Sequence, residues 1–203
     1  APYFRAPPQP QDVVWHYAGV RPLLDDGRAS SRVTRDWRLE LDTSGPPLLT
    51  VSGGKLTTCR RLAEAAVDRL ASVLGCPAAA WTAHGPPLPG GEFSGGVEAL
   101  AAVLRIGRPW LAPATALRLA RSYGTRATRI LGPATAGPPP GADFGAGLGA
   151  AEVDYLVQAE WARTAEDVLW RRSKLGLRLD AAAVARLAGY LAEAVPRLTG
   201  GHT

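Results

Sequence analysis

Apolar and polar residues alternate along the segment 33–42, which is the pattern of a strand with one buried face. One face carries Val33, Arg35, Trp37, Leu39 and Leu41, and the other carries Thr34, Asp36, Arg38, Glu40 and Asp42. The segment 13–20 is rich in β-branched and aromatic residues, and LLTVS at 48–52 is a short apolar run. We predict strands at all three places, half-buried at 33–42 and buried at 48–52.

The period changes to that of an amphipathic helix from about Thr57 to Leu74. Its apolar stripe consists of Leu62, Ala63, Ala66, Val67, Leu70 and Leu74. Gly75 follows the last apolar position, so we expect the helix to end there.

Gly and Pro are dense at 76–95, which predicts a linker. Helical patterns then occupy 96–106, 113–122, 125–131, 149–162, 165–174 and 181–198, with an irregular loop at 132–147. Thr164 and Asp167 have the spacing of a capping box, and Asp180 is the expected N-cap of the last helix. The sequence thus predicts an α+β chain in which a strand-containing part, 1–75, is followed by the linker and an all-helical domain, 96–203.

The composition is that of a folded, soluble chain, with 46% hydrophobic residues and no apolar run near the roughly 20 residues of a membrane span. The 203 residues contain no methionine, even at position 1, so we expect them to be part of a longer protein.

Cys59 and Cys76 have no neighbours at metal-ligand spacing, which predicts no metal site and a reducing compartment. The net charge of +5 is spread along the chain without a nucleic-acid reader motif, so we expect no nucleic-acid partner.

The stretch VSGGKLTTCRRLAEAAV, 51–67, leads from a strand through two glycines and a lysine into a helix. A helix start carries unpaired N–H groups and about half a positive charge, so this turn suits an electron-rich or anionic group. It is not a P-loop, because Leu49 stands at the first glycine position and Leu56 follows the lysine.

Two arginines fall where apolar residues belong. Arg35 is in phase with the apolar face of its strand, and Arg21 is in phase with the apolar face of the segment before it. A buried charge is costly unless it is paired, so each arginine either meets a carboxylate or carbonyl or binds a ligand. Together with Lys55 they favour an anionic small substrate, since guanidinium groups match phosphate or carboxylate oxygens.

Other motifs and residues are weaker candidates for a binding or catalytic site. GAGLGA at 145–150 has the spacing of a dinucleotide fingerprint but follows a Pro/Gly loop, so we interpret it as a helix lead-in. The three histidines show no nucleophile or metal spacing, and we expect Trp161 and Trp170 to pack between helices.

Five blocks carry a specific resemblance: YAGVRPL, TRDW, SGGKLTTCRRLAEAAVDRL, PLPGG and AEWARTAEDVLWRRSKLGLRL. Their order and spacing resemble the C-terminal part of the FAD-dependent, respiratory glycerol-3-phosphate dehydrogenases, from Val13 to about Leu198. The resemblance implies that 1–75 is the C-terminal portion of an FAD/substrate-binding domain and that 96–203 is a helical cap.

The resemblance also implies site residues. Gly54, Lys55, Leu56 and Thr57 would contact FAD, and Arg21, Arg35 and Lys55 would bind substrate. No catalytic residue is assigned, because the family's general base and dinucleotide fingerprint lie upstream of these blocks. Cys59 and Ser52 depart from the residues common at their positions in the family.

The implied activity is oxidation of sn-glycerol 3-phosphate to dihydroxyacetone phosphate, with hydride passing to FAD and electrons to quinone. The implied location is cytoplasmic; attachment to the inner face of the cell membrane and a homodimer are left open. We expect this chain alone neither to retain FAD nor to turn over. Two alternatives remain: an oxidase of the same family that uses oxygen, and a non-catalytic helical module for interaction or membrane docking.

Overall fold

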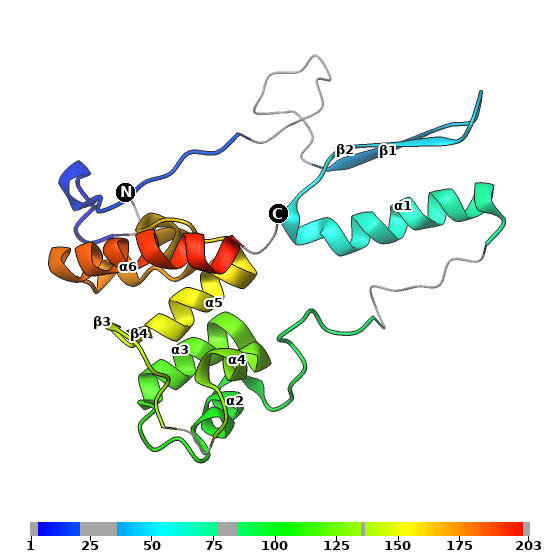
Figure 1. Cartoon of the computed structure of the whole chain (residues 1–203). Coiled ribbons are helices and arrows are strands. Elements are labelled where there is room, and N and C mark those ends of the chain that lie inside the picture. Colours follow the sequence, from blue (N-terminus) through cyan, green and yellow to red (C-terminus); the bar gives the residue numbers. More distant parts are fainter. Residues whose placement is uncertain (1–3, 21–35, 77–84, 135–136, 201–203) are drawn as a thin grey trace. The chain divides into compact units, whose positions relative to one another are not determined.

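The computed structural model describes residues 4–20, 36–76, 85–134 and 137–200, and it divides into two compact units, Ala1–Pro86 and Pro87–Thr203 (Figure 1). The division falls within the predicted linker at 76–95. The α+β class is confirmed: the described residues form antiparallel strands and a helical C-terminal unit.

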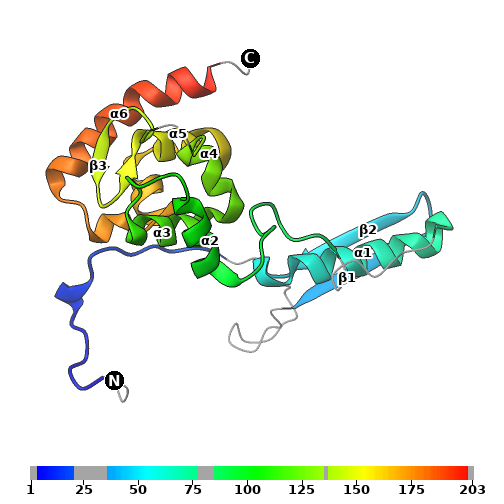
Figure 2. The same cartoon turned by 90° about the horizontal axis from the view of Figure 1, so that it is seen from below.

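The first unit is built on a hairpin and one helix. Strands β1 (Trp37–Asp42) and β2 (Leu48–Gly53) pair antiparallel, with Trp37 opposite Gly53. Helix α1 (Cys59–Leu74) packs along the hairpin and follows a 3₁₀ turn, Leu56–Thr58 (Figure 2). The alternation predicted for β1 is confirmed, since its residues are half-buried and exposed in turn. Gly75 ends α1 in the left-handed region, at φ +65°, as expected.

The predicted strand at 13–20 is wrong. The segment follows a short 3₁₀ helix, Pro10–Asp12, and pairs with no strand among the described residues. Tyr17 is 80% exposed and Val20 is 99% exposed. β-Branched and aromatic residues form a strand only where they pair with a neighbouring edge and pack on a surface, and this segment pairs with neither strand of the described hairpin.

The burial predicted for 48–52 is also wrong, because Leu48 is 61% exposed and Val51 is 47% exposed. Among the described residues of the first unit, none is fully buried. A single helix covers only one face of a two-stranded hairpin, so this unit has no closed core of its own.

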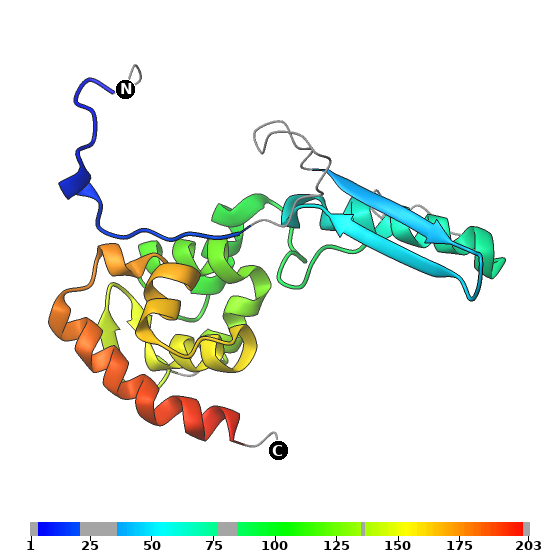
Figure 3. The same cartoon turned by 90° about the horizontal axis from the view of Figure 1, so that it is seen from above.

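The second unit holds the hydrophobic core. Its helices are α2 (Gly96–Arg105), α3 (Pro113–Tyr123), α4 (Ala127–Leu131), α5 (Ala150–Glu160) and α6 (Ala181–Thr199), with a π-helical segment, Asp167–Arg172, between the last two (Figure 3). All six helical segments predicted for this region are confirmed. The largest fully buried side chains are Phe144, Leu104, Leu148, Leu156, Leu169, Leu187, Val153, Val157 and Val168.

Both predicted helix caps are confirmed. The Asp167 carboxylate accepts hydrogen bonds from the Thr164 N–H at 3.0 Å, and the Asp167 N–H donates to the Thr164 hydroxyl at 3.2 Å. The Asp180 carboxylate accepts from the Ala183 N–H at 2.7 Å and so caps α6.

A short hairpin lies where the sequence predicts a loop and a helix lead-in. Strands β3 (Asp143–Gly145) and β4 (Leu148–Gly149) are antiparallel, and Ala146 and Gly147 turn between them with φ +52° and +74°. Phe144 and Leu148 anchor the hairpin in the core, at 1% and 0% exposure. The second unit is therefore not entirely helical.

Trp161 does not pack between helices, contrary to expectation. It is 76% exposed and ends α5 with a left-handed backbone, φ +55°. Trp170, in contrast, packs against the core as predicted.

Candidate functional site

The Gly53-Gly54-Lys55 turn brings the end of β2 to the start of the helix. Gly53 and Gly54 have φ +76° and +97°, in a region that side chains rarely adopt. A Cβ on Gly53 would lie 2.8 Å from the Asp36 carbonyl oxygen, and one on Gly54 would lie 3.2 Å from the Leu62 side chain. Both glycines are therefore required by local geometry.

At the helix start after these glycines, the hydroxyl of Thr58 forms hydrogen bonds with both backbone groups of Lys55. The Thr58 hydroxyl donates to the Lys55 carbonyl at 3.0 Å and accepts from the Lys55 N–H at 3.3 Å. The N–H groups of Leu56 and Thr57 lie in the first turn, where a helix provides no acceptor. Leu56 is 89% exposed. The turn thus offers backbone donors on an open surface, with the Lys55 side chain beside them.

The four predicted FAD contacts, Gly54, Lys55, Leu56 and Thr57, are contiguous in this turn. Arg21 and Arg35 lie outside the described residues, so their meeting with Lys55 stays a prediction. In β1 the side chains that share the phase of Arg35, beginning with Trp37, are the half-buried ones.

The second unit contains a buried polar cluster that the sequence analysis missed. Glu152 is 2% exposed, and its carboxylate accepts two hydrogen bonds from the Arg118 guanidinium, at 2.6 and 2.7 Å. The Tyr123 hydroxyl donates to the same carboxylate at 2.7 Å. Arg118 also donates to the Gly147 carbonyl at 2.8 Å and so ties α3 to the β3–β4 hairpin.

Burial and charge set the ionisation of this cluster. Burial raises the pKa of Tyr123 far above its usual range, and the neighbouring Glu152 charge raises it further, so this phenol stays protonated. Burial alone would lower the pKa of Arg118, but the hydrogen bonds and the charge of Glu152 outweigh it and raise that pKa. The cluster is therefore an ion pair between Arg118 and Glu152 whose carboxylate also accepts a hydrogen bond from the protonated Tyr123 hydroxyl.

One sequence signal could have revealed this cluster. Glu152 precedes Tyr155 and Leu156 by three and four residues, so it lies on the apolar face of its predicted helix. The same criterion, a charged residue in phase with the apolar positions of its element, identified Arg35.

The chain matches a known family. Residues 82–198 match the C-terminal domain of alpha-glycerophosphate oxidase. Among curated proteins, the chain is 47% identical over 194 residues to a glycerol-3-phosphate dehydrogenase of Pseudomonas aeruginosa, covering 94% of this chain and 38% of that protein. It is 44% identical over 185 residues to the aerobic glycerol-3-phosphate dehydrogenase of Escherichia coli, covering 90% of this chain and 37% of that protein.

A relative with another substrate in its name is nearly as similar. The D-erythritol 1-phosphate dehydrogenase of Brucella abortus is 43% identical over 183 residues, covering 89% of this chain and 36% of that protein. The chain thus spans little more than a third of the length of the curated relatives it matches. Within the described residues, no helix is long and apolar enough to cross a membrane.

Proposed function

Because the chain belongs to the family of the C-terminal domain of alpha-glycerophosphate oxidase, we propose that it forms part of an FAD-dependent glycerol-3-phosphate dehydrogenase. In this proposal the first unit supplies flavin and substrate contacts, and the second unit is a mainly helical cap. The activity belongs to a protein of the relatives' length, since this chain covers 38% of one relative and 37% of another.

The observation that carries the proposal is the Gly53-Gly54-Lys55 turn, whose residues fit a flavin. Gly53 and Gly54 keep the backbone free of side-chain atoms, and the first N–H groups of the helix are open to an acceptor. Such a helix start stabilises negative charge. Gly54, Lys55, Leu56 and Thr57 would hold FAD, which supplies a hydride acceptor when it is bound.

The substrate would be held by cations. Arg21, Arg35 and Lys55 supply groups that match phosphate oxygens and the oxygen on C2 of glycerol 3-phosphate. Their role is to orient the C2 alcohol and to stabilise negative charge near it. The incomplete burial of the first unit supports this assignment, because an open hairpin face suits packing against further chain of the same domain.

The electron acceptor and the location follow the same family. We propose quinone as acceptor and dihydroxyacetone phosphate as product, with the protein in the cytoplasm or at the inner face of the membrane. A homodimer is compatible with this proposal. The oxidase alternative differs only in using oxygen as acceptor.

The test is an anaerobic visible spectrum of a protein of the relatives' length that contains this chain. We expect a flavin spectrum that bleaches when sn-glycerol 3-phosphate is added. Arg21→Ala and Arg35→Ala should weaken bleaching at low substrate concentration, whereas Arg38→Ala should not. Arg38 is a matched control, because its side chain is 64% exposed and pairs with Glu40 at 2.7 Å on the other face of β1.

Each other result has a defined meaning. Absence of flavin would contradict the cofactor, and bound flavin that stays oxidised would contradict the substrate. D-erythritol 1-phosphate is the second substrate to test, since a relative 43% identical bears that name. Reoxidation of the bleached protein by oxygen as fast as by a soluble quinone would favour the oxidase.

A further inference from the structure

Two residues stand at N-cap positions where α1 begins, and neither side chain caps the helix. Lys55 precedes the 3₁₀ turn Leu56–Thr58, and Thr58 precedes α1 itself. A lysine ammonium has hydrogen-bond donors only, so it cannot accept from the first N–H groups. Threonine is a favoured N-cap residue, yet the Thr58 side chain makes no cap hydrogen bond to α1. The helix start thus lacks the stabilisation that a capping side chain usually gives.

The Thr58 hydroxyl binds the Lys55 backbone instead. It accepts from the Lys55 N–H at 3.3 Å and donates to the Lys55 carbonyl at 3.0 Å. The Thr58 N–H donates to the same carbonyl at 3.0 Å. Because one side chain satisfies both backbone groups of Lys55, it holds that residue in an extended conformation, with φ −134° and ψ 151°.

This arrangement decides which backbone donors remain for a ligand. The Lys55 N–H is occupied by the Thr58 hydroxyl. The next two N–H groups, of Leu56 and Thr57, make no hydrogen bond within the described residues, as is usual at a helix start. Both residues are exposed. The turn therefore presents two adjacent donors, and the fixed backbone of Lys55 sets the direction in which they begin.

We propose that Thr58 is a positioning residue of the flavin site. The inference rests on the proposed function: the Thr58 hydroxyl would hold Lys55 so that the N–H groups of Leu56 and Thr57 meet an electron-rich oxygen of the flavin. Reduction adds negative charge to a flavin, and a helix start stabilises such charge. Thr58 would therefore favour the reduced flavin over the oxidised flavin, although its own hydroxyl is engaged with Lys55.

The test measures the reduction potential of the flavin bound to a protein of the relatives' length, with Thr58→Val as the variant. Valine keeps the shape of the side chain and removes the hydroxyl. At equilibrium with one redox dye, we expect the ratio of reduced to oxidised flavin to fall about three- to tenfold, as the loss of one net hydrogen bond predicts. For a two-electron couple, this fall lowers the potential by roughly 15–30 mV.

Two variants serve as controls. Thr58→Ser keeps the hydroxyl and removes the methyl group, so it should keep the potential of the unchanged protein. Ser72→Ala removes a hydroxyl that also donates to the carbonyl three residues earlier, that of Arg69, at 2.7 Å. Ser72 lies about 20 Å further along the same helix, so the potential should not change. An unchanged potential in Thr58→Val would overturn the proposal, as would an equal fall in Thr58→Ser.

Amide hydrogen exchange of the flavin-free protein gives a second measurement that needs no cofactor. The Lys55 amide should exchange faster in Thr58→Val than in the unchanged protein, because its acceptor has been removed. The Leu56 and Thr57 amides should exchange rapidly in both proteins. Equal exchange at Lys55 in the two proteins would show that the hydroxyl does not hold this residue, and the proposal would be wrong.

Loss of flavin has a separate meaning in each protein. If the unchanged protein binds no flavin, the proposed function is contradicted and this inference with it, whereas a bound flavin whose potential ignores Thr58→Val contradicts this inference alone. If only Thr58→Val lacks flavin, the melting temperatures of the flavin-free proteins decide. Similar values would support the positioning role, and a large fall in the variant would show a structural role and overturn the proposal.

Discussion

The backbones of Gly90 and Gly124 cross at a distance that admits no side chain. The Thr125 N–H donates to the Gly90 carbonyl at 2.9 Å, and a Cβ added to Gly124 would overlap that carbonyl. A Cβ on Gly90 would lie 2.7 Å from the Tyr123 carbonyl oxygen. The PLPGG block is thus fixed to the end of α3 by a contact between two glycines.

We expect Gly124→Ala to lower the free energy of unfolding by roughly 3 kcal/mol or more. The substitution forces the two backbones apart and places a side chain at φ +56°. Urea unfolding followed by circular dichroism measures this change. A loss below about 1 kcal/mol would contradict the close crossing.

Gly189→Ala is the matched control for that substitution. Gly189 lies within α6, and nothing stands within 4 Å of the added Cβ. Because alanine favours the helix over glycine, we expect the free energy of unfolding to rise by about 0.5–1 kcal/mol.

Glu152→Gln should destabilise the second unit by about 3–5 kcal/mol, since it leaves the Arg118 charge buried without a counter-charge. The side chains of the pair are 16% and 3% exposed. Glu98→Gln, which breaks a pair with side chains 61% and 75% exposed, should cost less than about 1 kcal/mol. If urea unfolding gave similar losses of the free energy of unfolding for Glu152→Gln and Glu98→Gln, the stabilising role of the buried ion pair would be refuted.

Asp167 should stabilise the chain only while it is ionised. Burial acts to raise the pKa of its carboxyl, but hydrogen bonds from the Arg163 and Thr164 N–H groups and the charge of Arg171 bring it below the usual value of 3.8. A lowered folded-state pKa gives stability that is present above pH 4 and is lost as the pH falls through that pKa.

Asp167→Asn should therefore lower the free energy of unfolding by about 1 kcal/mol at pH 7. The difference from the unchanged chain should shrink as the pH falls from 4 toward 3. Unfolding curves at pH 7, 4 and 3 test this, and a difference that is constant over this range would show that the charge does not contribute.

Gly53→Ala should abolish flavin binding by a protein of the relatives' length, because its Cβ would lie 2.8 Å from the Asp36 carbonyl oxygen. Gly75→Ala is the control, since that glycine has φ +65° but no atom within 4 Å of an added Cβ. The flavin absorbance per protein measures the effect. Full flavin content in Gly53→Ala would remove this turn from the site.

Trp161→Gly should raise the free energy of unfolding by about 1 kcal/mol. Glycine adopts the left-handed backbone of this position without strain, and the indole, 76% exposed, buries little apolar surface. A loss of more than 1 kcal/mol would show that the indole packs more tightly than its exposure indicates.

Sequence alone determined the parts that depend on neighbours along the chain. Helical period, caps and glycine stops act within a few residues, so six helical segments of the second unit, the Thr164–Asp167 and Asp180 caps and the end of α1 at Gly75 were predicted. Family blocks located the Gly54–Thr57 turn, which remains a prediction as a flavin site.

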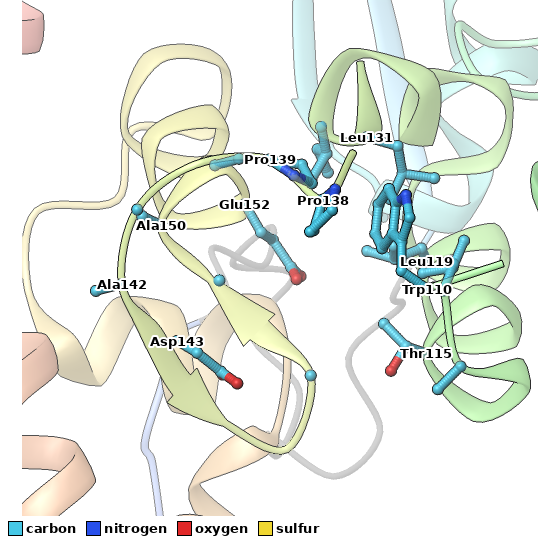
Figure 4. A pocket seen from close by; sticks show the side chains of 17 residues that line it. Trp110, Thr115, Leu119, Leu131, Pro138, Pro139, Ala142, Asp143, Ala150 and Glu152 are labelled. Atoms are coloured by element: carbon cyan, nitrogen blue, oxygen red, sulfur yellow. The ribbon is translucent and has the colours of Figure 1, made fainter. Parts of the chain in front are cut away.

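Tertiary structure decided what depends on partners distant in sequence. The 13–20 segment has β-branched residues but pairs with no described strand, whereas the glycine-rich segment 143–149 forms a hairpin because Phe144 and Leu148 reach the core. The meeting of Glu152 with Arg118, 34 residues away, and the cavity of about 420 Å³ that Trp110 and Glu152 line (Figure 4) likewise arise only when helices pack. Which side chains become buried or paired depends on contacts between segments that are distant in sequence. A local sequence pattern shows only which residues could make such contacts.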